Sequence, residues 1–238
     1  MLAFIMFDPL YFIVLAPAML LAFLAEMRVR SAYAKAGRIP ASSRLSGAEV
    51  ARRILKQNGL HDVEIEPSHG LLSDHYDPRK RVLRLSPDVY QGRSLASVGI
   101  AAHEAGHAIQ HGVHYGPLAL RNGLVPLAST GSSLAMIVFV IGMFLSAMPL
   151  GRTLMVLAIL MFGTVVVFQL VNLPVEFNAS RRALAALTDS GIVAVHEQAP
   201  VRRVLNAAAM TYVAATLSAM LTLLYLVLRS GLLGGRRN

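Results

Sequence analysis

The stretch TLMVLAILMFGTVVVFQLVNL, residues 153–173, decides the fold class of this chain, because it is uniformly apolar and contains no charged residue. A helix rises 1.5 Å per residue, so about 20 apolar residues cross the hydrocarbon core of a bilayer. Residues 124–148 and 207–228 have the same character, and a shorter apolar stretch covers residues 10–25. The sequence therefore predicts an all-α polytopic membrane protein with about four transmembrane helices.

The overall composition agrees with a membrane protein. Of the 238 residues, 55% are hydrophobic and only 15% are charged, whereas soluble domains carry about 25% charged residues. This balance argues against an ordinary soluble enzyme, a disordered tail and a coiled coil. The chain has no cysteine, which excludes disulfides, thiolate zinc sites and cysteine nucleophiles.

The first apolar stretch is interpreted as an uncleaved membrane anchor. A secretory signal would have Lys or Arg before its apolar run and a small-x-small cleavage site after it. Residues 1–9 contain no Lys or Arg, and no such cleavage site follows residue 25. We therefore expect residues 1–27 to stay attached as an N-terminal transmembrane helix.

The 22 Lys and Arg residues, which give a net charge of +9, predict the orientation in the membrane. Fourteen lie between residues 27 and 124 and four between residues 173 and 207. With four spans these two segments share one side, and the positive-inside rule places that side in the cytoplasm. Three arginines of the tail oppose this topology mildly. A fourth segment that re-enters or lies along the interface would remove the conflict.

This topology predicts five segments. Residues 28–123 form a cytoplasmic region, 124–173 a transmembrane hairpin, 174–206 a cytoplasmic helical segment and 207–238 a C-terminal transmembrane helix with its tail. The segment of residues 28–45 is basic overall and also contains Gly37 and Pro40. It is interpreted as a juxtamembrane linker. Its cations either rest on anionic lipid or form a solvated flank.

The cytoplasmic region combines helices with a small sheet. Ser46 and Glu49 form a capping box, which predicts a helix to about residue 58 that ends at Gly59. Residues 63–66 and 81–85 alternate in polarity, and residues 71–78 lie between them. We expect three strands in a small antiparallel sheet, followed by a helix over residues 94–111.

That last helix contains the motif HEAGH, residues 103–107. His103 and His107 are four residues apart, so both lie on one face of a helix and can bind one zinc ion. Glu104 is placed to accept a proton from a zinc-bound water. His111 lies about 12 Å from His103 along the helix, too far to reach the same ion. His114 is expected in a loop.

A catalytic zinc site needs a third protein ligand, and without cysteine a carboxylate is the natural choice. Glu176 is the best candidate, because two spans return it to the side that carries the histidines. Pro174 before it suits the first turn of a new helix. Glu197, expected in a loop beside Pro200, is the alternative ligand. Glu176 could also simply stabilise a helix N-terminus.

The stretches LSDHYDP (72–78), HEAGHAIQH (103–111) and VEFNASRRA (175–183) resemble the YugP-type membrane zinc metallopeptidases of bacteria. The resemblance implies a small α+β zincin-like cytoplasmic domain, one Zn²⁺ per chain, Glu176 as third ligand and the bacterial cytoplasmic membrane as location. More distantly, the chain is similar to HtpX-type and CAAX prenyl proteases, whose EFxAD-like motif has an aspartate that supports a ligand histidine. Here Ser180 replaces that aspartate, and Asn178 is a possible substitute.

The predicted function is hydrolysis of peptide bonds at the cytoplasmic membrane face by a zinc-activated water, with Glu104 as general base. The substrate would be a membrane-associated protein or peptide, and the bilayer is the other partner. Candidates for oxyanion stabilisation or substrate contact, each of which could instead be structural, are Arg181, Tyr212, His75 and Tyr76.

Three other functional classes fit the sequence less well. A zinc-binding membrane adaptor or scaffold that retains the peptidase fold without proteolysis is the main alternative, although such a site would not need Glu104. The uncharged spans disfavour a transporter or channel. Nucleic-acid binding is disfavoured because the arginines are dispersed and no stacking motif accompanies them.

Overall fold

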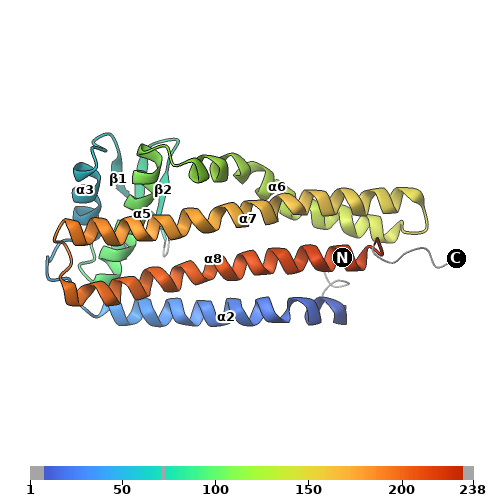
Figure 1. Ribbon diagram of the computed structural model, residues 1–238, viewed down its shortest axis with the longest axis horizontal. Coiled ribbons are helices and arrows are strands. Elements are labelled where there is room, and N and C mark those ends of the chain that lie inside the picture. The colour runs from blue at the N-terminus through green and yellow to red at the C-terminus, as the bar shows by residue number, and fades with distance from the viewer. Residues whose placement is uncertain (1–7, 71–72, 233–238) are drawn as a thin grey trace. The chain divides into compact units, whose positions relative to one another are not determined.

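The computed structural model describes residues 8–70 and 73–232 and is mostly helical, with one small sheet. Residues 1–7, residues 71–72 of the expected third strand and the tail arginines 236 and 237 lie outside the described part. Four helices are long and apolar enough to cross a membrane, as expected from the sequence. They are α2 (Pro9–Gly37), α6 (Gly116–Phe144), α7 (Pro149–Asp189) and α8 (Val195–Arg229) (Figure 1).

The chain divides into two compact units. The first, here called the apolar unit, comprises the described residues up to Leu24, Leu120–Leu173 and the described residues from Tyr212 onward. The second, here called the mixed unit because it contains helices and the sheet, comprises Ala25–Ala119 and Pro174–Thr211. Helices α2, α6, α7 and α8 each contribute to both units.

The apolar unit buries large side chains inside and exposes others outside. Phe139, Tyr225 and Leu226 are almost fully buried in its core. Ile13 and Leu160, in contrast, are 72% and 66% exposed. In water such exposure would be costly, whereas lipid tails solvate it. The outward apolar side chains therefore support a location within a bilayer.

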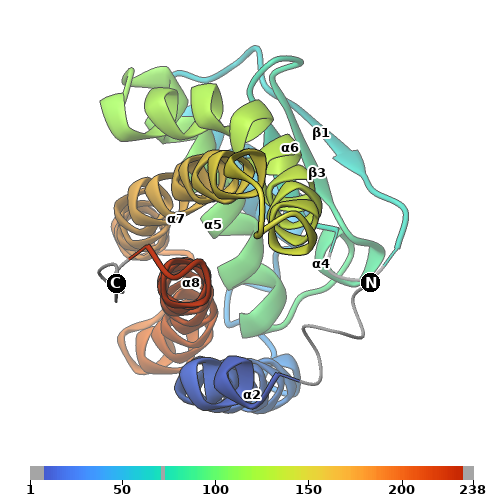
Figure 2. The same cartoon turned by 90° about the vertical axis from the view of Figure 1, so that its right-hand side faces the viewer.

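The mixed unit is built around α5 (Leu95–Gly112). Its central residues are buried on nearly every face, and α3 (Gly47–Gln57) packs against it. The capping box of α3 is present, with the Ser46 side chain accepting from the Glu49 amide and the Glu49 side chain accepting from the Ser46 amide. Helix α5 also contacts β3 (Val82–Leu85) and the short helix α4 (Pro87–Tyr90), and Figure 2 shows both beside it.

The sheet is mixed, which corrects the expectation of an antiparallel sheet. It consists of β1 (Glu64–Pro67), β2 (His75–Asp77) and β3 (Val82–Leu85), in the order β1-β3-β2. β3 pairs antiparallel with β2 and parallel with β1. After β1, the chain forms β2 at the opposite edge of the sheet. It then returns as β3, which lies between β1 and β2. Alternating polarity indicates strands but carries no information on their direction, so the sequence pattern could not distinguish the two arrangements.

Three expected helix boundaries are corrected. The linker expected over residues 28–45 is helical as far as Gly37, because Ala36 is buried in the core of the mixed unit. Pro174 begins no new helix but lies inside α7. Val175 and Ala179, one turn apart just beyond it, are fully buried, and their packing offsets the hydrogen bond that proline cannot donate. Glu197 lies in the first turn of α8 rather than in a loop.

Candidate metal centre

Helices α5 and α7 approach closely, which brings HEAGH on α5 next to the segment VEFNASRRA on α7. A Cβ atom at Gly106 would lie 2.6 Å from the carbonyl oxygen of Ala179. Because no side chain tolerates that separation, glycine is required at position 106, the fourth residue of HEAGH, for the two helix backbones to come this close. The adjoining turns then carry His103, His107 and Glu176 into contact.

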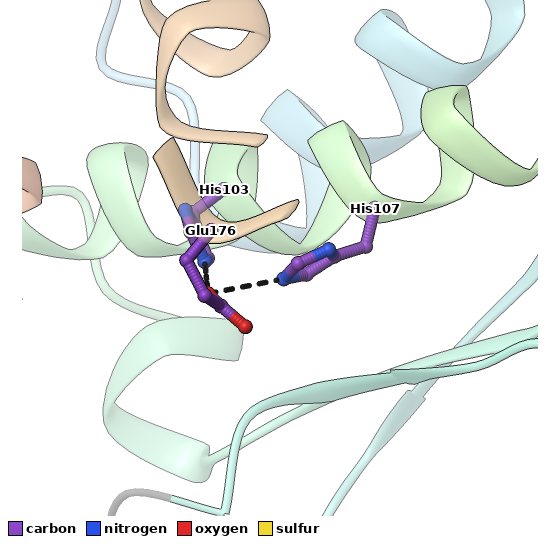
Figure 3. Close-up of side chains that lie close together, drawn as sticks. All are labelled: His103, His107 and Glu176. Carbon is purple, nitrogen blue, oxygen red and sulfur yellow. Dashed lines mark hydrogen bonds and ion pairs between the residues drawn. The ribbon is translucent and has the colours of Figure 1, made fainter. Parts of the chain in front are cut away.

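The three side chains converge on one point, as Figure 3 shows. Oε2 of Glu176 lies 3.2 Å from Nε2 of His103 and 3.5 Å from Nε2 of His107. One ligand atom from each of the three residues lies within 4.8 Å of the others. Ligand atoms bound tetrahedrally to one zinc ion at about 2.0–2.1 Å lie about 3.3–3.4 Å apart. The observed separations from Glu176 bracket that distance.

A buried amide fixes the proton on His107. The Gln110 side chain is fully buried, and its Nε2 donates to the Val175 carbonyl at 2.8 Å and to Asn178 Oδ1 at 3.0 Å. Its Oε1 therefore faces Nδ1 of His107, at 3.0 Å. Since an amide oxygen only accepts, that imidazole nitrogen carries the proton. In the neutral imidazole, Nε2 of His107 then keeps a lone pair on the side that faces Glu176.

Further contacts anchor this arrangement. Arg182 Nε donates to Asn178 Oδ1 at 2.7 Å, which fixes the orientation of that amide. The Arg182 guanidinium lies 6.0 Å from the Tyr115 ring centre. The hydrogen-bonded chain Arg182–Asn178–Gln110–His107 thus connects the surface of α7 to the candidate site.

The donor set fits a divalent cation. An imidazole lone pair and a carboxylate oxygen that face each other at 3.5 Å repel unless a cation lies between them. Two imidazole nitrogens and one carboxylate are a ligand combination typical of catalytic zinc sites. The geometry and chemistry of His103, His107 and Glu176 are therefore suitable for Zn²⁺.

Ser180 contacts the outer nitrogen of the other histidine. Its Oγ lies 3.2 Å from Nδ1 of His103. When Nε2 of His103 binds a metal, Nδ1 holds the proton and donates it to this hydroxyl. The serine that replaces the aspartate of the EFxAD-like pattern is thus in hydrogen-bonding reach of a histidine, while Asn178 contacts the other histidine only through Gln110.

Glu104, next to the histidines on α5, is buried, with 9% of its surface exposed. Burial raises the pKa of its carboxyl to about 7, because a charged carboxylate is poorly solvated there. The charge of His103 acts in the opposite direction, and the carboxylates of Glu176 and Asp74 reinforce the increase. Glu104 can therefore both accept and release a proton near neutral pH.

Two other sequence candidates lie on β2 beside this site. His75 is exposed, with Nδ1 2.8 Å from the Ser73 carbonyl, and its charge affects the pKa of Glu104. The hydroxyl of Tyr76 lies 2.8 Å from Nδ1 of His111. His111 is thus held by the sheet and is not among the three converging side chains, in agreement with the helix-spacing argument.

The remaining candidates lie elsewhere. Arg181 is exposed on α7, and Tyr212 belongs to the part of α8 within the apolar unit. His114 lies between α5 and α6 with a positive φ of 53°. Glu197, the alternative ligand, accepts hydrogen bonds at 2.8 Å from the Ser42 amide, the Ser42 hydroxyl and the Ala194 amide. These contacts satisfy its carboxylate as a cap of α8.

Comparison with known proteins decides the family. Residues 11–231 match a protein family described as "Putative neutral zinc metallopeptidase". The chain is also 46% identical over 208 residues to "Putative membrane protease YugP" of Bacillus subtilis strain 168, covering 87% of this chain and 91% of that protein. The chain belongs to this zinc metallopeptidase family. No solved structure matches it significantly.

Gln110 is the residue near the candidate metal centre that the sequence analysis did not identify. It lies three residues after His107 and therefore on the same face of α5. It is a polar side chain in a helix whose other inner residues are mostly small or apolar. A polar residue at that spacing was a signal for a histidine partner, but the acceptors that fix its orientation lie on α7 and could not be identified from the sequence.

Proposed function

We propose that this protein is a membrane zinc peptidase that hydrolyses peptide bonds of membrane-associated proteins or peptides. Its zinc ligands would be His103, His107 and Glu176, with one zinc ion per chain. The observation that carries the proposal is the convergence of two imidazole nitrogens and one carboxylate, with the His107 lone pair directed inward by Gln110. Membership of the zinc metallopeptidase family supports the same assignment.

Zinc, when bound, supplies a Lewis acid that lowers the pKa of water to about 7 and polarises a carbonyl group. The protein supplies the proton transfers. Glu104 would accept the proton of the attacking water and deliver it to the leaving amine, which makes it both general base and general acid. A carboxyl with a pKa near 7 suits both steps at neutral pH.

The burial of Glu104 has a second consequence for this mechanism. A general base that is shielded from bulk solvent keeps its proton for the substrate rather than exchanging it with water. Only 9% of the Glu104 surface is exposed, so the carboxyl is largely shielded in this way. Donors to the developing oxyanion would come from residues near the site; among the sequence candidates, His75 on β2 is one whose charge lowers the pKa of Glu104.

We place the site on the cytoplasmic side of the membrane. Support comes from the distribution of cations, since 18 of the 22 Lys and Arg residues lie in the two segments that carry HEAGH and Glu176. Substrates reaching this site would be membrane-protein tails, loops or segments close to the bilayer surface.

The test compares wild type with Glu104→Gln, both as full chains purified in detergent. Glutamine has the shape of glutamate but cannot accept the proton, so we expect both proteins to bind one zinc ion by elemental analysis. Cleavage of unfolded membrane-protein substrates, followed by mass spectrometry of the products, should fall by about 10²–10⁴-fold in Glu104→Gln. Equal zinc with no difference in cleavage would instead favour the non-proteolytic adaptor.

A further inference from the structure

A basic cavity of about 360 Å³ lies in the mixed unit between the last turns of α2 and the first turns of α8. It shares no residue with the candidate metal centre. We call it the basic cavity, and its principal lining side chains are Arg28, Ser31 and Lys35 of α2 and Arg203, Asn206 and Met210 of α8.

The residues that line the cavity lie on one face of α2 and one face of α8. On α2 the lining positions follow one another by three and four residues, and the same holds on α8. Residues at this spacing lie on one side of a helix. Neighbouring positions, including Ala36 on α2 and Val204 and Leu205 on α8, are buried in the core of the mixed unit. The two lining faces are therefore held beside each other by packing.

Within residues 8–70 and 73–232, the cations that line the cavity have no carboxylate partner. Of the residues that the structure describes, none with a carboxylate lies within ion-pair distance of Arg28, Lys35 or Arg203. The neighbouring Arg30 differs, because it pairs with Glu26 at 2.7 Å. Arg28, Lys35 and Arg203 are exposed where they line the cavity, and three like charges around one opening favour an anion there.

The cavity also lies where apolar sequence ends on both helices. The apolar stretch of α2 covers residues 10–25, and Arg28 follows three residues later. The apolar stretch of α8 begins at residue 207, directly after Asn206. In a membrane helix, the junction of apolar and basic sequence lies at the level of the lipid headgroups. Ala32, Ala207 and Met210 give the cavity an apolar portion as well.

We propose that the basic cavity binds the phosphate headgroup of an anionic phospholipid. The guanidinium groups of Arg28 and Arg203 and the ammonium of Lys35 would donate charge-assisted hydrogen bonds to the phosphate oxygens. Ser31 and Asn206 offer neutral hydrogen-bonding groups for the rest of the headgroup. The apolar portion favours a lipid over free phosphate, because it gives the first methylene groups of the acyl chains a surface to contact.

The test uses the delipidated full chain in detergent and native mass spectrometry to count bound lipids. Phosphatidylglycerol should bind once per chain, about tenfold more tightly than phosphatidylcholine. The triple substitution Arg28→Gln, Lys35→Gln and Arg203→Gln should abolish this preference. Excess inorganic phosphate should not displace the lipid. Displacement by phosphate would overturn the assignment of a lipid ligand.

A matched control separates a site from general surface charge. Arg30→Gln, Arg38→Gln and Arg202→Gln remove the same charge from or directly beside the same two helices, but none of these side chains lines the cavity. This control triple should keep the preference for phosphatidylglycerol. An equal loss in both triples would show that only the total charge matters and that the proposal is wrong.

A second variant tests the cavity without changing any charge. Ser31 is exposed at the cavity wall, so Ser31→Phe should fold normally while its ring occupies the space of the headgroup. Folding is checked by circular dichroism, and lipid binding should fall as in the charge triple. Binding of phosphatidylglycerol at the wild-type level in Ser31→Phe would contradict a role for the cavity. None of these measurements depends on peptidase activity.

Discussion

The apolar unit and the mixed unit share long helices but bury different kinds of side chain. In the apolar unit large side chains such as Phe139 and Tyr225 fill the interior and many others point outward. Its polar contacts include Asp8, which accepts from the Tyr225 hydroxyl at 3.0 Å and from Arg229 Nε at 3.1 Å, at the ends of α2 and α8. In the mixed unit, small residues on α5 let helices approach closely, and polar groups such as Gln110 and Glu176 lie fully buried.

The two units therefore differ in the kind of interaction that stabilises them. Burying a polar group is costly unless its hydrogen bonds are satisfied. In the mixed unit, the buried Gln110 side chain has three hydrogen-bond partners, which offset that cost. The apolar unit mainly buries apolar surface. We therefore expect substitutions of polar residues to have their largest effects in the mixed unit, and the following predictions test that contrast.

The largest effect is expected from a comparison of two buried glutamates. Glu176→Ala removes the carboxylate that faces both histidines, so zinc affinity should fall on the order of 100-fold or more. Zinc affinity is measured by competition with a coloured chelator. Glu197→Ala should keep zinc affinity close to wild type, because that carboxylate caps α8 instead.

Glu197→Ala should nevertheless lower thermal stability. Its loss leaves the Ala194 and Ser42 amides without their acceptor, at a cost of about 1–3 kcal/mol. Circular dichroism at increasing temperature suits this measurement, because the chain has no tryptophan for fluorescence. Full zinc occupancy in Glu176→Ala, or its loss in Glu197→Ala, would contradict the proposed ligand set.

The next effect concerns the residue that positions His107. Gln110→Leu keeps the size of the side chain but no longer fixes the proton on Nδ1, so zinc affinity should fall about 10–100-fold. A cobalt-substituted sample should show a changed visible absorption spectrum, which a purely structural defect far from the metal would not produce. The control Gln57→Leu changes a glutamine on α3 and should leave both zinc affinity and spectrum unchanged.

The smallest effect compares one glycine from each unit. Gly106→Ala places a methyl group 2.6 Å from the Ala179 carbonyl oxygen and should destabilise the protein by about 1–3 kcal/mol, because α5 and α7 must separate. A Cβ at Gly163 in the apolar unit has no neighbour within 4 Å. Gly163→Ala should therefore leave the melting temperature unchanged or raise it slightly. Equal destabilisation by both substitutions would show that close packing does not distinguish the units.

Local patterns predicted the elements of this protein better than their connections. The apolar stretches indicated four long helices, and the Ser46–Glu49 capping box predicted the start of α3 to the residue. The continuity of α7 through Pro174 was not predicted, because a proline's usual effect can be overcome by packing that the sequence does not display. The parallel pairing of β1 with β3 likewise depends on the path of the chain between strands.

The sequence by itself determined the apolar helices, the histidine pair and the basic character of the segments around them, because these depend on composition and on spacing within one helix. Only the tertiary structure decided which buried glutamate faces the histidines, since Glu176 is 73 residues from His103. It also decided the proton position on His107 and the assembly of the basic cavity from α2 and α8. These features arise when distant helices pack, and close packing selects neighbours that no local pattern records.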